Sequence, residues 1–257
     1  MANTAELIKQ IYKPMMTVGQ VYAKAWGQPG ELAPIGNVLE ASLEHSEDVQ
    51  TQEDMTKLGG GVHAEVRRIK DVKVKFKIAD LNLLNLARGT LGSIDSIQAG
   101  TEADLPYTVS SLGVLIPLDH ISPTAVVVKK GAAADSAQPV DMAANYEVRP
   151  EGIVLLSDAP DIAAADKLWL SYSYGDYAVI EALTTKAPEL QIMFGGLNEA
   201  DSGKPVVIDI WRASQGITKQ LTMLGKGFAS LDVEGTLMMD PTKTGAGISK
   251  YYRTRMG

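Results

Sequence analysis

The sequence contains no cysteine and only three histidines. The absence of cysteine excludes disulfide bonds, thiolate nucleophiles and cysteine-ligated zinc. His45, His63 and His120 are scattered along the chain, whereas a zinc site needs three or four ligands. Motifs of serine hydrolases, P-loop proteins and zinc proteases are absent too. A histidine could act as a general base, but none has a supporting motif, so we interpret all three as surface or hairpin residues. We therefore expect no catalytic residue, no metal and no cofactor.

Long apolar runs and excess positive charge are also missing. No apolar stretch is long enough to cross a membrane as a helix. The N-terminus lacks the basic start, apolar run and cleavage site of a signal peptide, which predicts a soluble protein made in the cytoplasm. The net charge of -7 gives no global basic field to attract nucleic acid.

What the sequence does contain is enough apolar material for a core, arranged mostly in strand-like alternation. The 257 residues, 45% of them apolar, suffice for one large β domain or two small ones. Residues 71–78 alternate strictly between charged and apolar side chains, which predicts a strand with one buried face. The strand is expected to span residues 62–78, with a bend or bulge near residues 67–70.

A short amphipathic helix is expected directly after this strand. Asp80 is a suitable N-cap for a helix over residues 80–90. The residues expected to pack its buried face are Leu83, Leu84, Ala87 and Leu91.

The chain changes character between residues 119 and 177, which are rich in alanine and turn clusters. Short strands are expected there at residues 124–130, 146–149, 152–156 and 167–174. We interpret 119–177 as a small inserted β domain within a discontinuous main domain, residues 1–118 and 178–257. Residues 5–12 could form a short helix or an arm, and another strand is expected over residues 228–239.

Residues 46–61 are almost without apolar side chains and are expected to form a long polar loop. Such a loop is unusual in a compact domain unless it has a role, for example ordering against a neighbouring subunit. Its acidic residues do not match a calcium loop, and its glycines are followed by a strand and not by a phosphate-binding helix. The residues proposed for the inter-subunit contact are Glu47, Asp48, Glu53, Asp54, Lys57, Gly59, Gly60 and Gly61.

Two charged stripes allow more than one interpretation. Lys73, Lys75 and Lys77 share a strand face that could be solvated or could contact an acidic neighbouring subunit. Asp232 and Glu234 could form the carboxylate pair of a glycosidase, because alternate strand residues lie about 7 Å apart. A wet acidic sheet face is the simpler interpretation, since no aromatic cleft is evident beside them.

Several segments together resemble the major tail tube proteins of long-tailed, siphovirus-like bacteriophages. They are the opening strand at residues 36–43 before a charged loop, the long strand ending in the helix at residues 80–90, and the closing strand at residues 226–237. The insert adds a strand, turn, strand and aromatic strand at residues 146–148, 152–155 and 168–174. The layout covers most of the chain, although the smallest tube proteins lack such an insert.

The resemblance implies a β-sandwich or barrel with one flanking helix and a structural role in the virion, not an enzymatic one. Six copies would join their sheets into a ring, and rings would stack into a tail tube that conducts double-stranded genomic DNA during ejection. Expected partners are further copies of the chain, the tape measure, the tail terminator and the distal tail protein; no membrane is involved. The protein would reside in the virion tail, and in the host cytoplasm during assembly. Candidate lumen-facing carboxylates, which would repel phosphate, are Glu40, Glu44, Asp232 and Glu234.

A binding module is the alternative to a self-assembling subunit. The insert would then recognise a host-surface glycan or protein through Trp169, Tyr172 and Tyr174, since aromatic faces serve such recognition. The competing interpretation of these aromatic residues is core packing of the insert.

Overall fold

The computed structural model describes residues 14–257, so the helix or arm expected at residues 5–12 lies outside the described part. The protein is mainly β, with 51% strand and 7% helix, as the alternating sequence predicts. Its antiparallel sheets do not close into a barrel. The chain divides into two compact units: unit 1 comprises residues 1–94 and 180–257, and unit 2 comprises residues 95–179.

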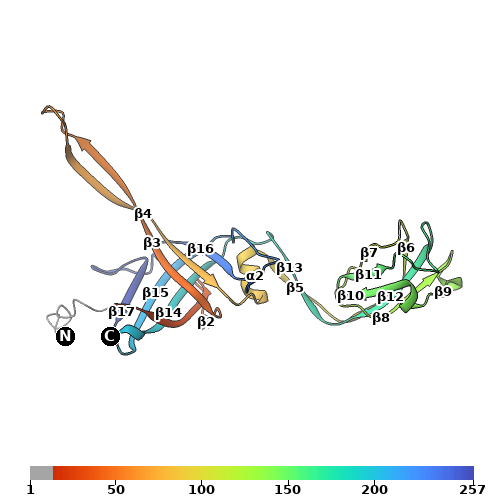
Figure 1. The fold of residues 1–257 in the computed structure, drawn as a ribbon. Coiled ribbons are helices and arrows are strands. Elements are labelled where there is room, and N and C mark those ends of the chain that lie inside the picture. Colours follow the sequence, from red (N-terminus) through yellow and green to blue (C-terminus); the bar gives the residue numbers. More distant parts are fainter. Residues whose placement is uncertain (1–13) are drawn as a thin grey trace. The chain divides into compact units, whose positions relative to one another are not determined.

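Unit 1 is built on one large sheet whose strands follow the order β2-β1-β14-β15-β16-β4-β3, with β17 paired to β15 (Figure 1). The strands are β1 (Thr17–Ala25), β2 (Ala33–Pro34), β3 (Val38–Glu53), β4 (Val62–Ile78), β14 (Glu189–Asn198), β15 (Lys204–Gln215), β16 (Leu231–Leu237) and β17 (Tyr252–Met256). A 3-10 turn, η2 (Glu199–Asp201), joins β14 to β15. β15 pairs with β17 near its start and with β16 near its end, so the sheet branches there.

The core of unit 1 follows from the alternation along β4. Val72, Val74, Phe76 and Ile78 are buried in one cluster with apolar residues of β1, β14, β15 and β16. The intervening lysines lie on the opposite, wetter face. The predicted bulge is confirmed: Ser46 pairs with Asp71 but Glu47 pairs with Ile69, which leaves Lys70 as the extra residue.

The helix α2 (Leu83–Thr90) follows β4 as expected, but its cap and its buried face differ from the prediction. Asn82 is the N-cap and accepts from the Asn85 backbone N–H at 2.9 Å. Asp80 instead accepts from the Asn37 backbone N–H.

The residues of α2 that face the sheet are small or polar. The buried residues are Asn85, Ala87 and Gly89, while Leu83 and Leu84 are 47% and 49% exposed. A Cβ at Gly89 would lie 2.8 Å from Leu231, so the helix sits too close to the sheet for leucines on that face. Of the predicted packing residues, Ala87 is buried and Leu91, the left-handed C-cap, is half-buried.

The expected strand at residues 228–239 is shorter in the structure, because β16 begins only at Leu231. The strands β5 (Ser93–Ile97) and β13 (Tyr177–Glu181) pair with each other where the chain passes between the two units.

Unit 2 confirms an inserted β domain but begins earlier than residue 119. β6 (Gly100–Thr108) pairs with β12 (Lys167–Tyr174), so residues predicted for the main domain belong to the insert. The remaining elements are β7 (Leu115–Pro117), β8 (Thr124–Lys130), η1 (Ala134–Ser136), β9 (Gln138–Pro139), α3 (Met142–Asn145), β10 (Tyr146–Arg149) and β11 (Gly152–Leu155). They form the sheets β6-β12-β8-β9 and β10-β11-β7 around a separate apolar core.

Candidate assembly surfaces

The most unusual feature of unit 1 is the ribbon of β3 and β4 beyond the Lys70 bulge, residues 47–69, which we call the arm. The two strands pair only with each other there (Figure 1). Every residue of the arm is exposed except Asp54, which is half-buried. The arm therefore contributes almost nothing to the core.

The predicted polar loop at residues 46–61 is mostly part of this arm and not a loop. β3 continues to Glu53, and only residues 54–61 form the connecting turn. The polar segment is extended because its backbone pairs with β4, and that pairing needs no apolar side chains. The turn closes where the Asp54 N–H donates to Gly61 O at 2.7 Å, and Gly59, Gly60 and Gly61 all take positive φ angles.

The predicted contact residues of the arm are partly engaged within it. Arg67 pairs with Glu47 at 3.2 Å and also with Glu65. Asp48 lies opposite Arg68 in the strand register. Asp54 caps the turn by accepting from the Thr56 N–H and hydroxyl, and these hydrogen bonds lower the pKa of its carboxyl. Among the described residues, neither Glu53 nor Lys57 forms an ion pair.

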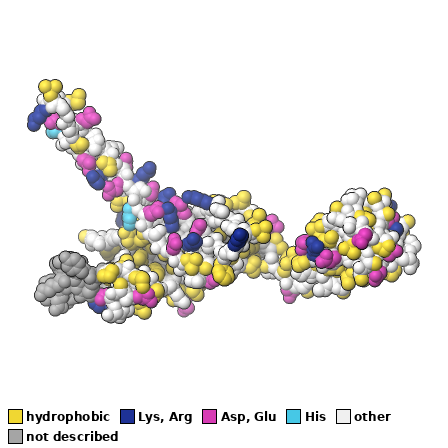
Figure 2. All heavy atoms as spheres, viewed as in Figure 1, with side chains coloured by type: hydrophobic (Ala, Val, Ile, Leu, Met, Phe, Trp, Pro, Cys, Tyr) yellow, Lys and Arg dark blue, Asp and Glu magenta, His cyan; other side chains and the backbone are white. Residues whose placement is uncertain are grey.

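The arm also carries apolar side chains that sequence reasoning did not single out. Figure 2 shows hydrophobic side chains among charged ones out to the end of the arm. They are Val49, Met55, Leu58, Val62, Val66 and Ile69, between 44% and 107% exposed. Exposed apolar groups clustered on one projection mark an interaction surface.

The four predicted lumen carboxylates do come together. Glu40, Glu44, Asp232 and Glu234 line one groove of about 420 Å³ on the outer face of β3, β4 and β16. β4 runs between the two acidic strands, so its lysines lie among these carboxylates. Lys75 Nζ lies 2.7 Å from Glu44 Oε1. The face is thus a mosaic of both charges and not the carboxylate wall that was expected. Two lysines of the stripe, Lys73 and Lys75, have acidic partners within the same chain.

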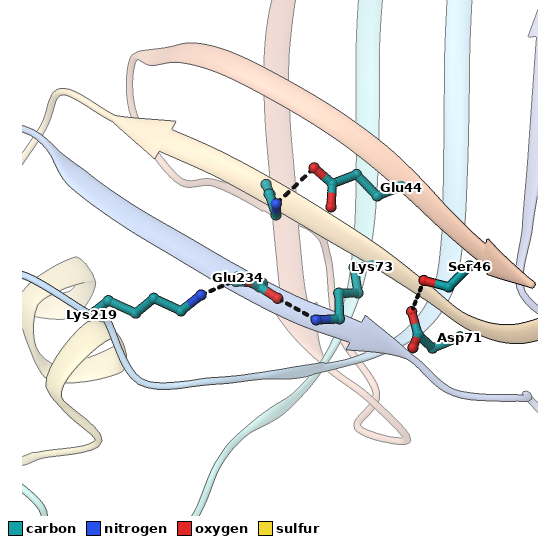
Figure 3. A network of polar contacts seen from close by, with 7 residues as sticks. Glu44, Ser46, Asp71, Lys73, Lys219 and Glu234 are labelled. Carbon is teal, nitrogen blue, oxygen red and sulfur yellow. Dashed lines mark hydrogen bonds and ion pairs between the residues drawn. The ribbon is translucent and has the colours of Figure 1, made fainter.

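Glu234 is the most strongly engaged of these carboxylates. Lys73 Nζ lies 2.8 Å from its Oε1 and Lys219 Nζ lies 3.0 Å from its Oε2 (Figure 3). These two hydrogen-bonded lysines lower the pKa of Glu234 to about 2. A general acid needs a raised pKa, so Glu234 is not suited to the general-acid role in the carboxylate pair considered for Asp232 and Glu234.

A second apolar surface, missed by sequence reasoning, lies in the connection between β15 and β16. Met223, Leu224 and Phe228 are 88%, 95% and 106% exposed. The sequence predicts Phe228 as the first residue of a strand over residues 228–239. In the structure β16 begins three residues later, at Leu231.

The aromatic residues of the insert are largely used for its own packing. Tyr172 is 1% exposed and belongs to the interior. The Trp169 indole N–H donates to Gly131 O at 3.0 Å, and Tyr174 stacks on His120 at 3.5 Å between ring centroids. The core-packing interpretation is correct for Tyr172. The three aromatic side chains therefore do not form one exposed binding surface.

Two of the three histidines contact tyrosine hydroxyls. His45 Nε2 lies 2.9 Å from the Tyr252 hydroxyl, and His120 Nδ1 lies 2.8 Å from the Tyr177 hydroxyl. Within residues 14–257, no group of three or more histidine, aspartate or glutamate side chains is arranged to hold a metal ion. A cavity of about 30 Å³ between α2 and the sheet, lined by Phe76, Asn85 and Arg88 among others, has room for little more than a water molecule.

These features define a two-unit β protein with a projecting ribbon and a charge-paired sheet face. The chain belongs to the family described as "Protein of unknown function UCP028589", whose model matches residues 14–255. No curated protein matches the chain. No helix in the described part is both long and apolar enough to span a membrane.

Proposed function

We propose that the protein is a structural subunit that assembles with further copies of itself into stacked rings, the tail tube of a long-tailed bacteriophage. The observation that carries the proposal is the arm, which projects from the unit 1 sheet without any core of its own. An isolated two-stranded ribbon is marginally stable in water. A second surface that covers its apolar side chains would stabilise it.

The free edges of the unit 1 sheet support the same proposal. β3 is an edge strand of 16 residues, paired on one side only with β4. At the other end of the sheet, β2 covers only two residues of β1, Tyr22 and Ala23. Unpaired edges are sites of strand addition between chains. Since the two edges differ, joining one to the other is a head-to-tail contact that can close into a ring.

The tube would conduct double-stranded DNA, as the resemblance implies, and six copies per ring are expected on the same ground. The charged face carries four carboxylates and the lysines Lys73, Lys75, Lys77 and Lys219. Such a neutral mosaic offers phosphate no net attraction, and the whole chain carries a charge of -7. Transient passage of DNA needs this weak interaction. The tape measure, tail terminator and distal tail protein would be the other partners, and the virion the final location.

Electron microscopy of negatively stained protein over a range of concentrations, with mass measurement in solution, tests the proposal. Rings or hollow tubes are expected. The test variant replaces residues 47–70 with an Asn-Gly turn. This two-residue turn connects Ser46 to its pairing partner Asp71. Because the arm buries little, this variant should keep the melting temperature of the full chain and lose assembly.

A matched control changes an exposed apolar residue outside the arm, Met142→Ser in unit 2, and should assemble normally. A full chain that stays monomeric at every concentration, or an armless variant that still forms tubes, would contradict the proposal.

A further inference from the structure

The connection between β15 and β16 is a closed loop and not a loose linker. Thr218 fixes its base: the Thr218 N–H donates to Gly89 O at 2.7 Å, and its hydroxyl donates to Asp232 O at 2.8 Å. β15 ends at Gln215, three residues before Thr218, and the chain returns to the sheet at Leu231. Residues 219–230, which we call the apolar loop, therefore have adjoining ends, and residues 219–229 are all exposed.

The apolar loop exposes large apolar side chains, a composition typical of a protein-binding surface. Met223, Leu224 and Phe228 are almost fully exposed, and Leu221 is 42% exposed. The loop contains Lys219 and Lys226 and no acidic residue. Soluble monomers rarely expose several large apolar side chains on one loop, so a partner with apolar and acidic groups would fit it.

The end of the arm carries exposed apolar side chains beside acidic ones, which complement the apolar and basic side chains of the apolar loop. Met55 and Leu58 are 84% and 107% exposed at the turn. Glu53 and Asp54 precede them directly. Among the described residues neither Glu53 nor Lys226 has a side-chain partner, so both charges are available to a second molecule.

We propose that the end of the arm of one copy docks on the apolar loop of another copy. This inference rests on the proposed self-assembly and names the two surfaces that meet. Met55 and Leu58 would pack against Met223, Leu224 and Phe228, and Glu53 would face Lys226. The two surfaces are different parts of the same chain, so the contact is head-to-tail and each copy both gives and receives an arm. Such a contact either closes into a ring or continues from one copy to the next along a stack.

Cross-linking tests the contact directly, because the chain has no cysteine and introduced cysteines are unique. A chain carrying both Leu58→Cys and Phe228→Cys, assembled and treated with a short bis-maleimide, should give a ladder of covalent oligomers. Leu58→Cys combined with Leu183→Cys is the matched control, since Leu183 is 71% exposed but lies outside the apolar loop. A control ladder as strong as the test ladder would overturn the proposal.

Charge reversal gives an independent test with full chains. Lys226→Glu and Glu53→Lys should each raise the concentration needed for assembly by roughly tenfold, because each places like charges in contact. Combining both changes restores the opposite charges and should recover assembly. Two single variants that assemble normally, or a double variant no better than the singles, would contradict the contact.

The failure of this inference is distinguishable from failure of the proposed function. If the unmodified chain forms no rings or tubes, both are wrong. If it assembles but shows neither the specific ladder nor the charge rescue, only the arm-to-loop contact is wrong. Binding of the unassembled chain to phosphatidylcholine vesicles containing phosphatidylglycerol, abolished by Lys226→Glu, would assign the loop to an anionic membrane surface and overturn the contact.

Discussion

Glu234 connects two lysines that are distant in sequence from each other, Lys73 on β4 and Lys219 at the start of the apolar loop. The single carboxylate therefore joins the sheet face to the loop base (Figure 3). Its side chain is 25% exposed, so water screens part of the attraction. The ion pairs should hold this corner of the sheet in place with a modest effect on overall stability.

The pH dependence of stability tests this role through Glu234→Gln. The folded-state pKa of Glu234, about 2, lies below its ordinary value of 4.5. Its contribution is thus present above pH 4.5 and is lost as the pH falls toward 2. At pH 7 the variant should lose about 1 kcal/mol of unfolding free energy, allowing for screening. Urea unfolding at pH 7 and pH 3 measures the difference, which should shrink at the lower pH.

Glu40→Gln is the control for this titration, because Glu40 lies in the same groove without an ion pair among the described residues. It should change stability little at either pH. An equal loss for both variants, or a Glu234→Gln effect that does not change with pH, would contradict the ion-pair explanation.

At the scale of elements, the pairing of β1 with β14 depends on glycines. Gly19 lies opposite Gly196, and a Cβ on Gly19 would come within 2.3 Å of Gly195 O. Backbone atoms cannot move aside as a side chain can. We expect Gly19→Ala to cost about 3 kcal/mol of unfolding free energy, at the upper end of overpacking effects.

Chemical denaturation of Gly19→Ala and of Gly227→Ala provides the comparison. Gly227 belongs to the same unit, and nothing lies within 4 Å of the position of its Cβ. The Gly227 variant should stay within about 0.5 kcal/mol of the unmodified chain. Equal stabilities of the two variants would show that the β1–β14 approach is not a constraint.

Local sequence patterns predicted the elements whose residues alternate over a buried face. β4, its bulge and the strands β8, β10 and β12 follow from such patterns, because period-two burial leaves a direct trace in sequence. The β3 half of the arm, beyond Ser46, leaves no such trace. Both of its faces are wet, so its polar residues resemble those of a loop, and only the pairing of β3 with β4 makes them a strand.

The errors at the helix and in the site have a different cause. Leu83 and Leu84 have the spacing of a buried face, but the close approach of Gly89 to Leu231 selects the small face of α2 instead. The acidic stripe was predicted correctly as one face. Its neutralisation depends on contacts such as Lys73 with Glu234, which are separated by 161 residues. Local patterns do not determine pairings at that distance.

At the scale of the whole molecule, the chain consists of two units with separate cores. The core of unit 1 is centred on residues such as Val74 and Leu231, and that of unit 2 on residues such as Ile153 and Leu168. The sequence indicated an insert but placed its start too late, because β6 has no compositional change to mark it. A domain inserted between two paired strands generally folds independently of its host.

Excision of unit 2 tests whether the units are independent. β5 and β13 pair with each other, the Ser93 N–H donates to Thr184 Oγ1 at 2.9 Å at one end, and the Ala99 N–H donates to Asp176 Oδ1 at the other. Replacing residues 98–176 with Asn-Gly should therefore turn β5 and β13 into a simple hairpin. We expect the shortened chain to fold cooperatively with the circular dichroism of a β protein and still form rings or tubes, because the arm, the sheet edges and the apolar loop all belong to unit 1.

The complementary half of this experiment expresses residues 95–179 alone. Its buried cluster includes ten residues, so it should fold as a monomer with dispersed amide resonances, and it should neither assemble nor block assembly of the full chain. Excising residues 119–177 instead would remove β12 and leave β6 without its partner, and that variant should aggregate. If the shortened chain lacking 98–176 unfolds, the two units support each other. If it folds but fails to assemble while the full chain forms tubes, unit 2 carries a subunit contact, and the assembly surfaces are not confined to unit 1.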